Sequence, residues 1–232
     1  MIRIFSLYLF CAFIMSCNAQ TSEINSEVKT KENMSKAILA SGCFWGTEYF
    51  LKRVDGVLST QVGYTGGFVE NPTYEQVCSK RTGHYEASEI IFDIEKTNFE
   101  KILRVFFETH DPTQKNGQGP DIGPQYKSAI FYFNESQKKT AEDLIQILEA
   151  KGLSIATEVL PAAVFYSAES YHQDYYDRKG GVPYCHGYRI LFYLKKIKFL
   201  KQLFVENSFC TSILASVKSV FSWGNEYLKF QY

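Results

Sequence analysis

A cysteine in the segment SGCFWG, residues 41–46, has neighbours that suit a nucleophile. Cys43 follows a short apolar run and precedes a segment of helical spacing, which predicts that it lies where a helix begins. Unpaired backbone N–H groups and the positive end of the helix dipole favour the thiolate there, the form of cysteine that attacks. Phe44 and Trp45 would form an apolar wall beside the sulfur, and the flanking glycines allow a tight turn. A small buried structural cysteine fits these local features equally well.

The elements expected to position Cys43 follow one another in a recognisable order. The helix after Cys43 would bury Trp45, Tyr49, Phe50 and Val54 and stop at Gly56. Strands are predicted at 36–42, 57–67, 87–95, 127–134 and 154–160, and further helices at 97–110 and 135–152. The order β-α-β-β-α-β, followed by α-β, predicts an α+β fold, a two-layer α/β sandwich with a mixed sheet and a ferredoxin-like core with an extension.

The N-terminal residues are typical of a leader rather than of a folded domain. Residues 1–17 combine a basic start, a short apolar run and small residues, as in a secretory signal. The sequence IMSC at 14–17 resembles a bacterial lipobox, with Cys17 as the lipidation candidate; a plain cleaved signal and an uncleaved anchor remain alternatives. We expect an exported lipoprotein of the bacterial cell envelope, facing the periplasm and held to the membrane by its lipid anchor. Residues 18–36 would be a flexible tether.

Charge and cysteine usage exclude several classes of protein. Lys+Arg and Asp+Glu both number 25, which gives no basic excess for nucleic acid. The six cysteines are scattered without a CxxC motif, which argues against a zinc ribbon and a disulfide scaffold. The histidines lack the spacing of metal ligands, so we expect no metal. The length suggests one domain with appendages, and we expect a monomer.

Six blocks of the sequence, in register, resemble the peptide methionine sulfoxide reductase A family. They are GCFWG, GYTGG, NPTYEQVCSKRTGHYE, HDPTQKNGQGPDIGPQYKSAIFY, YHQDYY and PYCHGY. The resemblance runs from about residue 37 to about residue 188 and implies a catalytic domain at 37–190. It also implies the family's fold, which agrees with the ferredoxin-like order of elements.

The resemblance implies three catalytic roles. Cys43 would attack the sulfur of methionine sulfoxide and become a sulfenic acid, and Glu86 would protonate the sulfoxide oxygen, which otherwise leaves poorly. Cys185 would then form a disulfide with Cys43. No cofactor is implied: an external dithiol, usually thioredoxin in this family, reduces the disulfide. The substrate would be the S epimer, free or in oxidised proteins, and the role would be repair of oxidative damage.

The resemblance also implies the residues that hold the substrate. Phe44 and Trp45 match the pocket for the methyl group. Tyr74 and Tyr126 match phenols that hydrogen-bond the sulfoxide oxygen, and Asp121 matches a carboxylate that fixes the polar end of the substrate.

Several residues depart from the family pattern or have no role in it. Tyr85 stands where the family usually has a small residue, and it would either narrow the site or point outward. Phe107 replaces a common Trp, and Cys78 is interpreted as structural. The segment 191–232 is an atypical C-terminal tail that contains Cys210, a weak candidate for a second recycling thiol.

Two rival functions stay open at this point. A hydrolase would pair Cys43 with His84 or His172, which explains the thiol but not the aromatic pair, the glutamate and the second cysteine. A lipoprotein that binds apolar peptides would use the aromatic residues alone, without chemistry at Cys43.

Overall fold

The computed structural model describes residues 33–192. The strands are β1 (Met34–Ser41), β2 (Val57–Thr65), β3 (Tyr85–Asp93), β4 (Gly117–Gln118), β5 (Asp121–Ile122), β6 (Ser128–Tyr132), β7 (Glu158–Pro161) and β8 (Tyr166–Ser167). The helices are α2 (Phe44–Leu51), α3 (Tyr74–Cys78), α4 (Phe99–Thr109), the short 3₁₀ helix η1 (Pro124–Tyr126), α5 (Glu135–Glu149) and α6 (Tyr175–Lys179).

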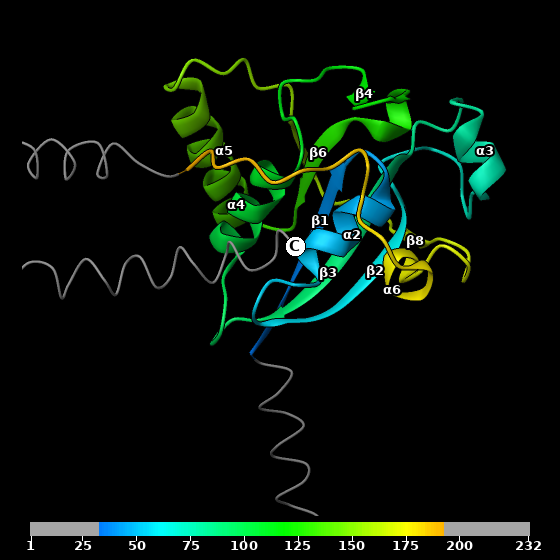
Figure 1. Ribbon diagram of the computed structural model, residues 1–232, viewed down its shortest axis with the longest axis horizontal. Coiled ribbons are helices and arrows are strands. Elements are labelled where there is room, and N and C mark those ends of the chain that lie inside the picture. Colours follow the sequence, from blue (N-terminus) through cyan, green and yellow to red (C-terminus); the bar gives the residue numbers. More distant parts are fainter. Residues whose placement is uncertain (1–32, 193–232) are drawn as a thin grey trace, which may run out of the picture. The chain divides into compact units, whose positions relative to one another are not determined.

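The main sheet confirms the predicted fold class. Its strand order is β7-β6-β1-β3-β2-β8 (Figure 1). β1 pairs antiparallel with β3 and β6, and β3 pairs antiparallel with β2, which is the split βαβ arrangement of a ferredoxin-like core. β7 adds in parallel to β6 and β8 adds antiparallel to β2, so the sheet is mixed and carries an extension at each edge.

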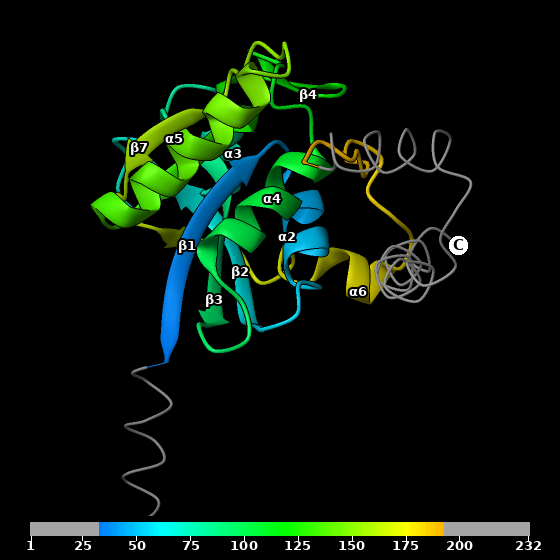
Figure 2. The same ribbon diagram turned by 90° about the vertical axis from the view of Figure 1, so that its left-hand side faces the viewer.

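Helices cover one face of this sheet, where most of the core lies (Figure 2). Because strand side chains alternate between faces, Leu39, Ile90 and Ile130 point together toward α4 and α5 and form one buried cluster with them. The neighbouring residues Ile38 and Ala129 belong to a second cluster on the other face. The molecule therefore has the two layers that the sequence predicts.

The two long helices begin at residues with side-chain caps. Asn98 accepts a hydrogen bond from the backbone N–H of Lys101 at the start of α4, and Asn134 accepts one from Gln137 at the start of α5. α4 buries its apolar stripe against the sheet and so fixes the segment that follows it, which passes close to the site. None of the helices within residues 33–192 is long and apolar enough to cross a membrane.

The predicted buried face of the helix after Cys43 is wrong by one residue. α2 buries Phe44, Thr47, Glu48 and Leu51, whereas Trp45 lies only partly buried, and the helix ends at Leu51 rather than near Gly56. Glu48 explains why the hydrophobic pattern predicted the wrong buried face for this helix. Its carboxylate accepts hydrogen bonds from the Thr60 hydroxyl and from the backbone N–H of Asp174, so a charged residue points inward.

Some sequence predictions fall on residues that the structure does not describe. The leader at 1–17 with Cys17, most of the tether at 18–36 and nearly all of the tail at 191–232 with Cys210 lie outside the described range. At the boundary, β1 begins at Met34, so the last residues assigned to the tether belong to the sheet.

Candidate active site

Cys43 lies at the turn between β1 and α2, as the sequence predicts. It is the N-cap residue of α2, it is 7% exposed, and its carbonyl accepts the first backbone bonds of the helix from Gly46 and Thr47. Gly42 before it has a φ of 100°, in the region that favours glycine, and a Cβ there would lie 2.4 Å from the Cβ of Gln118. The glycine therefore permits the sharp turn that brings the thiol to the helix start.

The structure brings the two cysteines of the proposed redox pair together. The sulfurs of Cys43 and Cys185 and one carboxylate oxygen of Asp121 all lie within 4.8 Å of one another. Both thiols are buried and free. The hydroxyl of Tyr184 donates to the Asp121 carboxylate, with 3.3 Å to Oδ1 and 3.4 Å to Oδ2. The turn before α2, strand β5 and the segment after α6 thus converge on one point.

The helix end does not dominate the acidity of Cys43 in this arrangement. A hydrogen bond with Cys185, followed by burial, raises the pKa of the Cys43 thiol well above its ordinary value. The backbone N–H of Trp45 acts in the opposite direction, as expected for a helix start, but it is outweighed. The expectation of a favoured thiolate is therefore wrong for the state in which the two thiols face each other.

Glu86 lies beside Cys43 on β3 and is 1% exposed. Its Oε2 accepts a hydrogen bond of 3.2 Å from the backbone N–H of Phe44, while Oε1 has no hydrogen-bond partner among the described residues. Burial, and then the charge of Cys43, raise the pKa of Glu86 well above its ordinary value. Both effects favour the protonated form of the carboxyl group, which is the form that a general acid needs.

Two phenols lie within the electrostatic reach of Glu86. Tyr74 begins α3 and Tyr126 ends η1, and both are partly buried. Burial, with a contribution from the charge of Glu86, raises the pKa of both tyrosines, so both stay protonated at neutral pH and can donate hydrogen bonds. The side chain of Cys78 hydrogen-bonds Tyr74, which gives this cysteine a local structural contact.

Aromatic rings enclose the side of the site next to α2. Phe44 is 1% exposed, and its ring centroid lies 5.1 Å from that of His172. Trp45 is more accessible and stacks on Tyr175 of α6 at 3.8 Å. His172 also packs 4.4 Å from the ring of Tyr74. The predicted apolar wall therefore includes rings from the YHQDYY block, to which the sequence analysis assigned no part in this wall.

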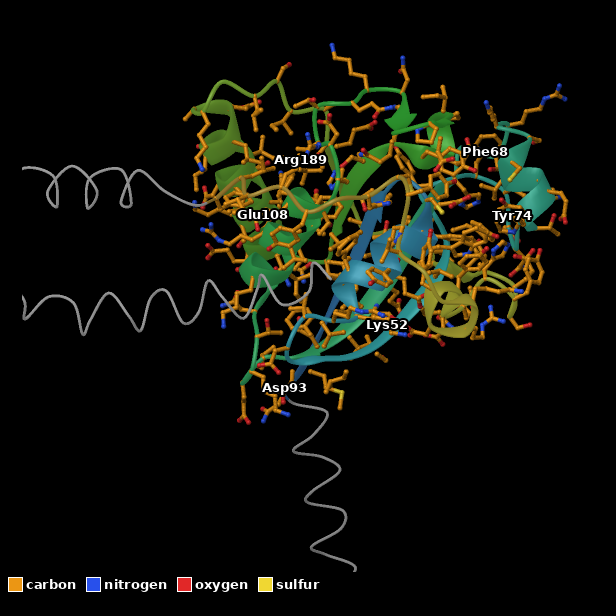
Figure 3. All side chains as sticks on the ribbon, in the orientation of Figure 1. Lys52, Phe68, Tyr74, Asp93, Glu108 and Arg189 are labelled. Carbon is orange, nitrogen blue, oxygen red and sulfur yellow. The ribbon has the colours of Figure 1, made fainter. Side chains whose placement is uncertain are left out.

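Cys185 is held in place by contacts that sequence reasoning missed. The segment 187–192, here called the strap, follows it and forms no helix or strand. The buried carboxylate of Glu108 accepts hydrogen bonds from the hydroxyl of Tyr188 and from the backbone N–H groups of Leu191 and Phe192, at 2.8, 3.0 and 3.0 Å. The backbone N–H of Arg189 donates to the carbonyl of Glu108. Figure 3 labels both residues, which lie next to each other and well away from Tyr74.

Tyr85 does not narrow the site. Because it precedes Glu86 on β3, its side chain points to the opposite face of the sheet. There its hydroxyl donates to Glu158 at 3.2 Å and its ring packs edge-on against Phe131 at 5.5 Å. Phe107 belongs to α4 and is fully buried in the core cluster.

Among residues 33–192, no hydrogen bond links Cys43 to either imidazole proposed for a hydrolase. The ring nitrogens of His84 contact the backbone of Gly67 and Val69 at 3.2 and 2.7 Å. His172 is buried among aromatic rings, and neither of its nitrogens has a hydrogen-bond partner in the described part of the chain. A facing thiol pair, a protonated carboxyl and two phenols define instead a thiol-dependent oxidoreductase.

Comparisons with known proteins identify the family. The chain matches the family model "Peptide methionine sulfoxide reductase" over residues 35–206, past the domain end at 190 that the sequence predicts. It is 48% identical to peptide methionine sulfoxide reductase MsrA of Sulfolobus acidocaldarius over 169 residues, which cover 72% of this chain and 94% of the relative. It is 51% identical to MsrA 1 of Rhodopirellula baltica over 160 residues, which cover 68% and 83%.

Solved structures agree. Methionine sulfoxide reductase A of Corynebacterium diphtheriae aligns with a TM-score of 0.60 and 34% identity, covering 66% of this chain and 79% of that one. Mxr1 from Saccharomyces cerevisiae in reduced form aligns with a TM-score of 0.64 and 31% identity, covering 68% and 93%. The chain belongs to the peptide methionine sulfoxide reductase family, and it is an oxidoreductase that reduces methionine sulfoxide at the expense of thiols.

Proposed function

We propose that Cys43 reduces methionine-S-sulfoxide, free or in oxidised proteins, through a sulfenic acid and a disulfide with Cys185. The observation that carries this assignment is the convergence of the two sulfurs and Asp121 within 4.8 Å, next to a buried Glu86. The third cysteine in the described part of the chain, Cys78, lies on α3 and contacts Tyr74 instead.

In the first step the Cys43 thiol gives up its proton to solvent, and its sulfur then bonds to the sulfoxide sulfur. Glu86 gives its proton to the sulfoxide oxygen, and the unpartnered Oε1 of its carboxyl group supports this contact. Tyr74 and Tyr126 donate hydrogen bonds to the same oxygen. The hydroxyl oxygen then passes from the substrate sulfur to the sulfur of Cys43 as the bond between the two sulfurs breaks. Methionine leaves and Cys43 remains as a sulfenic acid, so the substrate sulfur is reduced and the cysteine sulfur is oxidised.

The second step restores the site. The thiol of Cys185 attacks the sulfenic acid, water leaves, and a Cys43–Cys185 disulfide forms. A thioredoxin-like dithiol then exchanges with this disulfide and returns both thiols. Asp121 orients the polar end of the substrate, and Phe44 with Trp45 contacts its methyl group.

A reductase assay on the full-length protein tests the catalytic assignment. We measure methionine formed from each epimer of a peptide-bound methionine sulfoxide, with dithiothreitol as reductant. The wild type and Cys78→Ser should reduce the S epimer, and Cys43→Ser should form no methionine. Reduction by Cys43→Ser, or a preference for the R epimer, would overturn the assignment.

We also propose that the protein is exported and anchored through a lipid on Cys17. The basic start, the apolar run and the lipobox-like residues 14–17 support this proposal. Mass spectrometry of the mature N-terminus should find an acylated Cys17 as the first residue, and Cys17→Ala should release the protein from the membrane fraction. A mature N-terminus without acylation contradicts it.

A further inference from the structure

His186 lies directly against the recycling thiol. Its Nδ1 is 3.1 Å from the sulfur of Cys185, and the residue is 7% exposed. Gly46 of α2 provides the space for the ring, since a Cβ at that position would lie 2.2 Å from Nδ1. The imidazole is therefore packed between α2 and the chain that carries Cys185, in a position that a larger residue at 46 would close.

The surroundings of His186 assign its tautomer. Nε2 faces Ser41, whose hydroxyl lies 3.4 Å away and whose backbone carbonyl accepts a hydrogen bond from the ring. The hydroxyl of Ser41 is already paired with that of Thr47 at 2.7 Å. With the ring proton on Nε2, the lone pair of Nδ1 points at the Cys185 thiol as an acceptor.

The ring is also neutral in the folded protein at physiological pH. Burial lowers the pKa of His186 to about 4, although the hydrogen bond to Ser41 and the charge of Asp121 act in the opposite direction. The lone pair of a neutral imidazole beside a thiol can take the thiol proton, and the low pKa makes the resulting imidazolium a strong acid toward a leaving hydroxide. No hydrogen bond is found between Asp121 and the Cys185 thiol among the described residues, whereas Nδ1 of His186 lies within hydrogen-bond distance of it.

We propose that His186 is the general base of the recycling step, an inference that rests on the proposed function. Nδ1 takes the proton of the Cys185 thiol as its sulfur attacks the sulfur of the Cys43 sulfenic acid. The new S–S bond forms as the S–O bond breaks, and the leaving hydroxide receives the proton from the imidazolium to become water. Cys185 is oxidised, Cys43 is reduced, and His186 returns to its neutral form.

The test follows the sulfenic acid in a single turnover without reductant. Full-length wild type and His186→Asn react with a peptide methionine sulfoxide; methionine is quantified, and Cys43 is trapped with dimedone at successive times. In His186→Asn the conversion of sulfenic acid to disulfide should slow by about 100-fold, the low end of general-base effects. Cys185→Ser supplies the limit in which the sulfenic acid persists. Conversion at the wild-type rate in His186→Asn overturns the proposal.

A pH series separates chemistry from positioning. The ionisable groups that face the imidazole are Cys185, Asp121 and His110. In His186→Asn, hydroxide from solvent must remove the thiol proton, so the rate should rise about tenfold per pH unit from about pH 6 to about pH 8, more steeply than in the wild type. An equal loss at every pH means that the ring only positions Cys185 and overturns the base assignment. If the wild type itself forms no methionine, the proposed function fails instead.

Discussion

The two reactive cysteines are held by different kinds of structure. Cys43 caps a helix whose other side is packed on the central sheet, and Glu86 belongs to the sheet itself. Cys185 lies in a segment without regular structure. Gly180 and Gly181, both with positive φ, precede this segment, and the strap that follows it is hydrogen-bonded to α4. Regular secondary structure therefore fixes the attacking thiol, whereas a few hydrogen bonds between the strap and the end of α4 fix the recycling thiol. Mutations near Cys43 should therefore slow the reduction of the sulfoxide, whereas mutations near Cys185 should slow the formation of the disulfide.

The largest expected effect is the loss of first-turnover rate when Glu86 on strand β3 is changed. Glu86→Gln removes the acidic proton, and the first turnover should slow by about a hundredfold or more, with a smaller effect on substrate binding. In the wild type the protonated carboxyl is the active form, so the first-turnover rate should fall as the pH rises through the raised pKa of Glu86. The variant should not show this decrease. Stopped-time methionine assays measure both.

Glu89→Gln is the matched control on the same strand. Glu89 pairs with Lys36 away from Cys43, so its substitution should change the first turnover by less than about twofold. A similar loss in both variants would mean that the effect comes from β3 and not from the acid.

The strap gives the next effect. Glu108→Gln weakens the hydrogen bonds to the charged carboxylate, and the free energy of unfolding should fall by about 2 kcal/mol. Because the strap then loosens, disulfide formation should slow several-fold while the first turnover stays near the wild-type rate. Urea unfolding and the dimedone time course measure these effects.

Asp143→Asn on the exposed face of α5 is the control, since the Asp143 carboxylate pairs with Lys139 within its own helix. If Glu108→Gln slows the first turnover as much as disulfide formation, the two regions are not independent.

The contact between the two thiols gives a smaller effect. Removing the Cys185 thiol in Cys185→Ala deletes the main cause of the raised pKa of Cys43, so that pKa should fall. The midpoint of the pH profile for alkylation of Cys43, followed by peptide mass spectrometry, should move to lower pH. A midpoint that stays in place would show that burial alone sets the acidity of the thiol.

The smallest effect is expected on the other face of the sheet. Tyr85→Phe removes one hydrogen bond to Glu158 and should cost about 1 kcal/mol of unfolding free energy or less. Both half-reactions should keep their wild-type rates, because the side chain points away from Glu86. A changed preference for substrates would show that Tyr85 does influence the active site.

Sequence reasoning predicted what depends on local pattern and on the family motifs. The strand and helix order followed from periodicity, and the turn before Cys43 followed from the glycine and the apolar run. It failed on α2, where the inward-facing Glu48 breaks the hydrophobic pattern. It also missed His186 and Glu108, because their partners are distant in the chain, and only the fold shows that Gly46 leaves space for an imidazole.

One measurement tests the central claim most directly: the thiol connectivity after a single turnover. The full-length reduced protein reacts with one equivalent of peptide methionine-S-sulfoxide without reductant, free thiols are blocked, and disulfide peptides are mapped by mass spectrometry. The account predicts one methionine per chain and one disulfide, between Cys43 and Cys185. A disulfide from Cys43 to Cys78 or Cys210, or methionine formed while Cys43 remains a free thiol, would contradict it.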